Sequence, residues 1–121
     1  MKTITIDLGD GDCAELYEQL RHGTARRIQE VYQPYHDLPD YKAAMGLPTV
    51  KERVTKLTQI ISQVDMIRAG DVLILGQIKE WTLGEISQAT LDDMPEKQHE
   101  KLIREANKLY EPPLPESKAG D

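Results

Sequence analysis

Residues 49–70 read TVKERVTKLTQIISQVDMIRAG, and this stretch decides the fold class. Thr49 and Glu52 have the spacing of a capping box, in which the two side chains satisfy free backbone N–H groups at the start of a helix. The apolar residues recur at steps of three and four, the period of an amphipathic helix. They are Val50, Val54, Leu57, Ile61 and Val64, with Ile60 and Ile67 widening the stripe. The pattern predicts one helix from Val50 to Ile67, ended by Gly70.

The next segment begins at Asp71, which can cap a helix. Residues 72–75 alone fit a buried strand equally well, because a short apolar run does not distinguish the two. Apolar residues keep helical spacing further along, at Ile74, Leu75, Ile78 and Trp81. This favours a helix from Val72 to about Trp81, although Gly76 inside it costs roughly 1 kcal/mol relative to alanine.

The carboxyl-terminal third predicts two more helical segments. A short turn of helix is expected around Leu91–Met94, and Pro95 suits the first position of a longer helix. Its buried face is expected to consist of Leu102, Ile103, Ala106, Leu109 and Tyr110.

The amino-terminal residues have a different period. Thr3–Leu8 alternates polar and apolar side chains, which is typical of a strand, and the Gly-Asp-Gly-Asp run at 9–12 favours a hairpin turn. Cys13–Tyr17 is then the return strand, although Leu16, Tyr17 and Leu20 also fit the start of a helix. An isolated two-stranded hairpin is only marginally stable, so this one must pack on helices or pair with another chain.

The segment between the hairpin and residue 49 predicts one helix and a loop. Thr24 follows Gly23 as an apparent N-cap, and Pro34 ends or kinks the helix near Gln33. Residues 37–48 predict a loop with one short turn at Tyr41–Met45. The whole chain is therefore expected to be mainly α with a small β element (α+β): an N-terminal β-hairpin followed by four to five helices.

Length and composition limit what such a chain can do. Its 121 residues suit a single globular domain over 1–110, with a flexible Pro- and Glu-containing tail over 111–121. The formal net charge of -6 disfavours nucleic acid and anionic membranes as main partners. No apolar run has the length of a membrane span, and no signal peptide is visible. The single cysteine, Cys13, excludes an intramolecular disulfide and fits a reducing compartment.

The sequence carries no recognisable catalytic or metal-binding motif. Asp7, Asp10 and Asp12 lack the spacing of a calcium loop, and a hairpin turn explains them without a metal. The three histidines lie in separate segments without the spacing of a zinc site. Cys13 could act as a nucleophile only with a base beside it, and a lone cysteine in a strand is more often a packed side chain. We expect no cofactor and no enzymatic activity.

From Asp71 onward the order of elements resembles the tail assembly chaperones of long-tailed phages and prophages. The resemblance rests on an apolar helix ending in Trp81, a connector with Ile86, the run Thr90-Leu91-Asp92-Asp93-Met94-Pro95, and a last helix. It covers about residues 71–110, and the hairpin, the length and the charged tail are similar in outline.

The resemblance implies a non-catalytic protein of the bacterial host cytoplasm that is not expected in the mature virion. Such chaperones bind the tape measure protein, keep it soluble, help to recruit tail tube protein and tend to form homo-oligomers. The family often makes a longer version by ribosomal frameshifting near the end of the short form.

The expected partner-binding residues follow from the predicted apolar stripe and from Trp81, which is either a core anchor or an interface anchor. One side of a stripe this wide can face the core and another side a partner. The expected residues are Val54, Leu57, Ile61, Val64, Trp81, Leu91 and Met94.

Other functions stay open at this point. A second interpretation is another small phage structural adaptor, from the head–tail junction or the tail, which would persist in the particle. A third is a small enzyme that uses Cys13 or a histidine. A DNA-binding regulator is the weakest alternative, because no predicted helix has a face rich in Arg and Lys.

Overall fold

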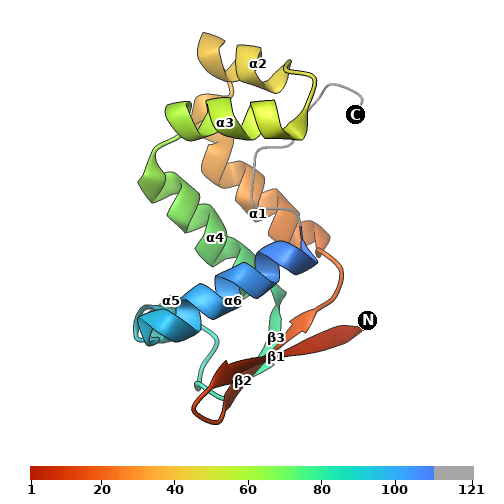
Figure 1. The fold of residues 1–121 in the computed structure, drawn as a ribbon, viewed down its shortest axis with the longest axis vertical. Coiled ribbons are helices and arrows are strands. Elements are labelled where there is room, and N and C mark those ends of the chain that lie inside the picture. Colours follow the sequence, from red (N-terminus) through yellow and green to blue (C-terminus); the bar gives the residue numbers. More distant parts are fainter. Residues whose placement is uncertain (111–121) are drawn as a thin grey trace.

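The computed structural model describes residues 1–110, so the predicted tail at 111–121 lies outside the described residues. Helices dominate, and a small sheet stands at one end (Figure 1), as predicted for a mainly α fold with a small β element. The strands are β1 (Thr3–Gly9), β2 (Asp12–Tyr17) and β3 (Ile78–Trp81). The helices are α1 (His22–Tyr32), the 3-10 turn η1 (Gln33–Tyr35), α2 (Pro39–Met45), α3 (Val50–Ile60), α4 (Gln63–Gln77), α5 (Gln88–Asp92) and α6 (Glu96–Leu109).

The predicted hairpin is confirmed. β1 and β2 pair antiparallel, with Thr5 opposite Glu15 and Ile6 opposite Ala14. Residues 9–11 all have positive φ in the turn, including the non-glycine Asp10 at 54°. Asp tolerates this conformation better than most side chains, which explains the Gly-Asp-Gly sequence at the turn.

The sheet has a third strand that the sequence analysis did not predict. β3 pairs antiparallel with β2, so the order is β1-β2-β3 and β1 and β3 are its edges. The predicted helix from Val72 to Trp81 is therefore wrong in its last turn: α4 ends at Gln77 and the chain continues as a strand. The helical spacing of Ile78 and Trp81 was misleading, because pairing with a strand more than 60 residues away overrides local periodicity.

The predicted helix from Val50 to Ile67 is also wrong, because two helices take its place. α3 ends at Ile60, Ile61 is extended with φ −81° and ψ 132°, and Ser62 caps α4 by accepting a hydrogen bond from the Asp65 N–H at 3.2 Å. The start of α3 is as predicted, since the Thr49 hydroxyl accepts from the Glu52 N–H at 3.1 Å. Gly70 does not end the helix, and lies inside α4.

Two smaller expectations are corrected in the same region of the sequence. Thr24 is not an N-cap: α1 begins two residues earlier, and Thr24 is fully buried within it. The segment predicted as a loop contains the helix α2, which begins at Pro39. Helix α1 ends before Pro34, as predicted.

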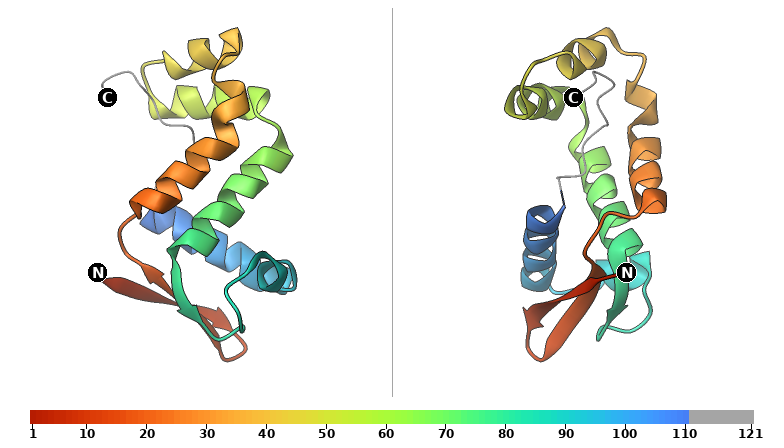
Figure 2. Two further views of the ribbon diagram at one scale, coloured as in Figure 1. Left: turned by 180° about the vertical axis from the view of Figure 1, so that it is seen from behind. Right: turned by 90° about the vertical axis from the view of Figure 1, so that its right-hand side faces the viewer.

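Helices α1 and α4 run side by side in opposite directions, α2 and α3 lie beyond one end of the pair, and the sheet lies at the other (Figures 1 and 2). α6 crosses the lower half and contacts both α4 and β1. The crossing of α1 and α4 is close at one point, where a Cβ on Gly76 would lie 2.8 Å from Thr24 Cγ2 and closer still to Thr24 Oγ1. Glycine at 76 lets the two helices approach, so its low helix propensity is offset by packing.

A single apolar core connects the sheet to the helices. It includes Leu16, Tyr32, Leu57, Leu73, Ile74 and Leu102, each at most 1% exposed. One buried polar side chain makes hydrogen bonds at the edge of this core: the Gln77 amide accepts from the Arg21 N–H at 3.1 Å and donates to the Gln19 carbonyl at 2.9 Å. These bonds fix the linker between β2 and α1 to the end of α4. Among residues 1–110, no helix has both the length and the apolar character to span a bilayer.

Candidate partner-binding surface

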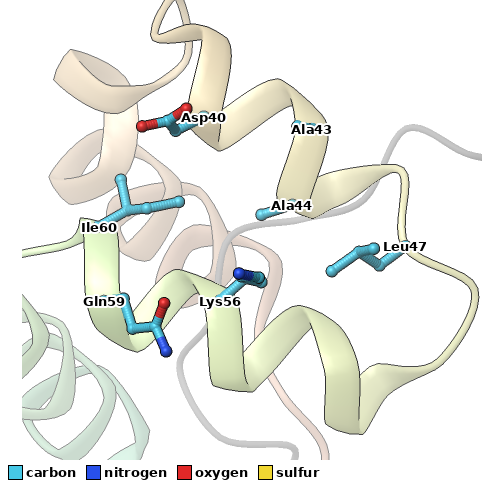
Figure 3. A pocket seen from close by; sticks show the side chains of 7 residues that line it. All are labelled: Asp40, Ala43, Ala44, Leu47, Lys56, Gln59 and Ile60. Carbon is cyan, nitrogen blue, oxygen red and sulfur yellow. The ribbon is translucent and has the colours of Figure 1, made fainter.

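A groove between α2 and α3 is the cavity that best fits a binding role. Its volume is about 390 Å³, and it is lined by Asp40, Ala43, Ala44, Leu47, Lys56, Gln59 and Ile60. Figure 3 shows these side chains on two helices that face each other and, for Leu47, on the connection between them, with Asp40 and Ile60 near one end and Leu47 at the other. The groove is open to solvent and is bordered by one acidic and one basic side chain.

The short connection between α2 and α3 makes the groove. Pro39 occupies the first turn of α2, where its missing N–H is harmless, and Asp40 lies near the positive end of the helix dipole. Gly46 follows as the C-cap, and the Arg53 guanidinium donates to the Leu47 carbonyl at 3.2 Å. This bond holds the connection against α3, so that the two helices stay apart at a fixed spacing.

The inner faces of α2 and α3 belong to the core. Tyr41 and Ala44 of α2 are 5% and 3% exposed, and Leu57 of α3 is 1% exposed. Within residues 1–110 the buried Tyr41 hydroxyl has no hydrogen-bond partner, and burial raises the pKa of Tyr41 to about 12. Tyr41 therefore stays neutral at physiological pH, and it anchors α2 without contributing a charge to the groove.

A second feature is a pair of exposed apolar side chains on α4. Val64 is 67% exposed and Ile67 is 57% exposed. Residues three apart lie on the same face of a helix, so the pair forms one small apolar surface. Exposed apolar residues are common on protein surfaces, so this small pair can add to a contact but does not define one by itself.

A hydrogen-bonded cluster fixes the direction of α4 where it leaves α3. The Tyr35 hydroxyl donates to the Asp65 carboxylate and accepts from the Ser62 N–H at 3.1 Å. The Arg68 guanidinium pairs with the same carboxylate at 3.0 Å. These bonds, that from Tyr35 first, lower the pKa of Asp65 below its usual value. The cluster therefore fixes the start of α4, on which Val64 and Ile67 lie.

The structure separates the seven residues expected to bind a partner. Four of them, Leu57, Ile61, Trp81 and Leu91, are 1–7% exposed and belong to the core. Trp81 closes the sheet end, and its indole N–H donates to the Gly84 carbonyl at 3.0 Å. Val54 and Met94 are half-buried, and Val64 alone is widely exposed. These residues do not form one surface, because the predicted stripe bends at Ser62 and turns mostly inward.

The sequence analysis missed most of the groove. Of its lining residues, only Ile60 was noted, as a widening of the stripe. The spacing of Ala43, Ala44 and Leu47 after Pro39 was a usable signal for a helix with one apolar side. No local signal places that side opposite Lys56 and Gln59, because the position depends on the fold.

Side chains that could bind a metal ion or act in catalysis are scattered over the described part of the chain. Within residues 1–110, no three His, Cys, Asp or Glu side chains gather in a way that could hold a metal ion. Cys13 is half-buried on β2, where its backbone N–H donates to the Thr82 hydroxyl at 3.0 Å. His99 lies 3.8 Å from the Asp71 carboxylate, at the contact between α6 and α4. The groove and the Val64–Ile67 pair are thus the features that most directly suggest a function.

Comparison with known proteins gives no relative from which a function could be transferred: no family model, no curated protein and no solved structure matches this chain.

Proposed function

We propose that this chain is a non-catalytic tail assembly chaperone of a long-tailed phage or prophage. In this role it binds the tape measure protein in the cytoplasm of the bacterial host, keeps it soluble and helps to recruit tail tube subunits. The groove between α2 and α3 is the observation that carries the proposal. The sequence resemblance over residues 71–110 supports it, although Trp81 ends the strand β3 and not a helix.

The groove suits side chains from an amphipathic helix. A volume of about 390 Å³ is too small for a whole helix, whose diameter with side chains is about 10–12 Å, but is large enough for several apolar side chains. Ala43, Ala44, Leu47 and Ile60 supply apolar walls. A helix that lays its apolar face on such a groove is a common mode of recognition, with anchors spaced three or four residues apart.

The charged residues at the groove add selectivity. Asp40 favours a cation on the bound helix and Lys56 favours an anion, so they prefer one orientation of the helix over the other. A tape measure protein is a long helical protein with exposed apolar seams, which provides many segments of this kind. Val64 and Ile67 offer additional apolar area for a partner of that length.

Co-expression with the tape measure protein encoded beside this chain tests the proposal. We expect the tape measure protein to stay in the soluble fraction and to co-purify with the chain. Ala43→Arg places a long charged side chain in the groove without touching the core, because Ala43 is exposed. This variant should bind about tenfold more weakly or worse, as when a central interface contact is lost.

Thr58→Arg is the matched control, because Thr58 is an exposed residue of α3 outside the groove. It adds the same charge and should bind as the unmodified chain does. The double variant Val64→Ser/Ile67→Ser measures the contribution of the second surface. A tape measure protein that remains insoluble with the unmodified chain, or binding unaffected by Ala43→Arg, contradicts the proposal.

Mass spectrometry of purified particles separates a chaperone from a structural adaptor. A chaperone leaves before maturation, so its peptides should be absent from virions and present in lysates of infected or induced cells. Peptides in virions at the abundance of a tail or head–tail component would replace the chaperone function with that of an adaptor.

A further inference from the structure

The outer edge of β1 is a second candidate binding surface. Within residues 1–110, the backbone N–H and C=O groups on this side of β1 have no partner strand. β1 is seven residues long and, among residues 1–110, pairs with β2 alone, so its other side is an edge of the sheet. The bond from the Glu18 N–H to the Lys2 carbonyl sets the alternation of the ladder. Ile4 and Ile6 then bond toward β2, while Thr3, Thr5 and Asp7 point their backbone groups outward.

This edge carries few of the features that keep exposed strands from pairing, and those it has, the charge of Asp7 and a break in register, lie at its far end. Within Thr3–Gly9 there is no Pro and no Lys, and the irregularity in register lies only at the far end, between Asp7 and Gly9. Ile4 is 43% exposed, although Ile6 and Leu8 on the same face are 7% and 5% exposed. The opposite edge differs, because β3 has only four residues and carries Lys79 and Glu80. The β3 edge is therefore protected against pairing with another chain, whereas the β1 edge is not.

We propose that the edge of β1 pairs antiparallel with β1 of a second copy of this chain, which forms a six-stranded sheet across a two-fold axis. A C2 contact requires a surface that is complementary to itself, and β1 meets this requirement when the axis passes at Thr5. Thr5 then faces the partner's Thr5, and Thr3 faces the partner's Asp7. The backbone N–H and C=O groups of all three outward residues then form hydrogen bonds with the partner strand.

The side chains are compatible with this register. Ile4 lies opposite the partner's Ile6, so that the exposed isoleucine is covered by an apolar neighbour. Threonine opposite threonine is a favourable cross-strand pair. Moving the axis to Asp7 would place two carboxylates opposite each other, and moving it to Thr3 would leave Asp7 without a partner residue in the strand. The arrangement is independent of the groove, which lies at the other end of the molecule.

The mass of the purified chain in solution, measured by light scattering after size exclusion, tests the pairing. We expect about twice the monomer mass of 13.7 kDa at tens to hundreds of micromolar. Thr5→Lys keeps the fold, because the Thr5 side chain is exposed, but puts like charges opposite each other across the axis. Thr5→Pro removes both N–H donors at the axis. Each variant should raise the dimer dissociation constant roughly tenfold or more, whereas Thr58→Lys should not change it.

A cross-link reports the register itself. Residues in such a hydrogen-bonded pair have Cα atoms about 5.5 Å apart, which is within the range of a disulfide. Thr5→Cys in a Cys13→Ala background should therefore form a disulfide-linked dimer on mild oxidation. Thr58→Cys in the same background should not, because Thr58 is an exposed residue of α3, which lies at the opposite end of the molecule from β1 (Figure 1). A monomer at several hundred micromolar, or a dimer that is insensitive to Thr5→Lys and Thr5→Pro, overturns the proposal. Neither result affects groove binding, which is measured with Ala43→Arg.

Discussion

Replacing Gly76 by alanine should destabilise the fold, although alanine is the better helix former. In an exposed helix the change would stabilise by about 1 kcal/mol. Here the new Cβ would lie 2.8 Å from Thr24 Cγ2 and 3.0 Å from Thr24 Cβ, inside normal contact distance, and Thr24 is fully buried. Overpacking of this kind costs about 1–3 kcal/mol, which exceeds the gain in helix propensity.

Gly70→Ala is the matched control, because it lies in the same helix. A Cβ at Gly70 would lie 3.5 Å from Ile103 Cδ1, an ordinary van der Waals contact. This variant should be as stable as the unmodified chain or more stable, by up to about 1 kcal/mol. The two alanine variants should therefore differ by about 1–3 kcal/mol in the free energy of unfolding.

Urea unfolding followed by Trp81 fluorescence and by circular dichroism measures the difference. Thr24→Ala in the Gly76→Ala background should recover part of the loss, because it removes Oγ1 and Cγ2, the atoms closest to the new methyl group. It also removes a buried hydroxyl that finds no hydrogen-bond partner in the described part of the chain. If Gly76→Ala matches or exceeds Gly70→Ala in stability, the close crossing of α1 and α4 is refuted.

Three further results are expected. Tyr35→Phe removes the main cause of the lowered pKa of Asp65. A carboxylate whose pKa is lowered by folding stabilises the folded state above its unfolded pKa of about 4, and this stabilisation is lost as the pH falls. The urea midpoints of the variant and the unmodified chain should therefore differ at pH 7 and converge toward pH 3. Gln77→Leu should cost about 2–4 kcal/mol by urea unfolding, because backbone groups of residues 19–21 lose their buried partners; a loss below 1 kcal/mol would contradict this role. Iodide should quench Trp81 weakly, since the ring is 7% exposed, and strong quenching in the native state would place it at the surface.

The sequence was informative wherever the structure depends on neighbours in the chain. The Gly-Asp-Gly turn, the Thr49 cap and the alternation of β1 act within a few residues, and all three lie where they were predicted. The last helix, α6, was also found from its 3.6-residue period and from Pro95 before it. These signals were sufficient for the fold class.

Errors arose where distant contacts decide between similar local patterns. Ile78 and Trp81 satisfy helical spacing, but their segment forms a strand because it pairs with the backbone of β2. The apolar stripe continues through Ile61, but Ser62 starts a new helix with help from the Tyr35 hydroxyl, 27 residues away. Neither contact can be inferred from the residues next to it.

The candidate site shows the same limit. Periodicity identifies apolar residues without telling which of them the fold will cover. Leu57 was expected to contact a partner and lies in the core, as does Trp81, for which the sequence left a core role and an interface role open. The groove depends on how α2 packs against α3, and the sequence analysis expected only a loop with one short turn at Tyr41–Met45 where α2 forms. Its lining residues become a site only through that arrangement.

Hydrogen exchange of the backbone amides, with and without a soluble fragment of the tape measure protein, tests the proposed binding most directly. We expect slower exchange in α2 and α3, concentrated around the groove residues, with smaller changes at the start of α4 and none in α6. No change in α2 and α3, or protection confined to other parts of the chain, would contradict binding through the groove.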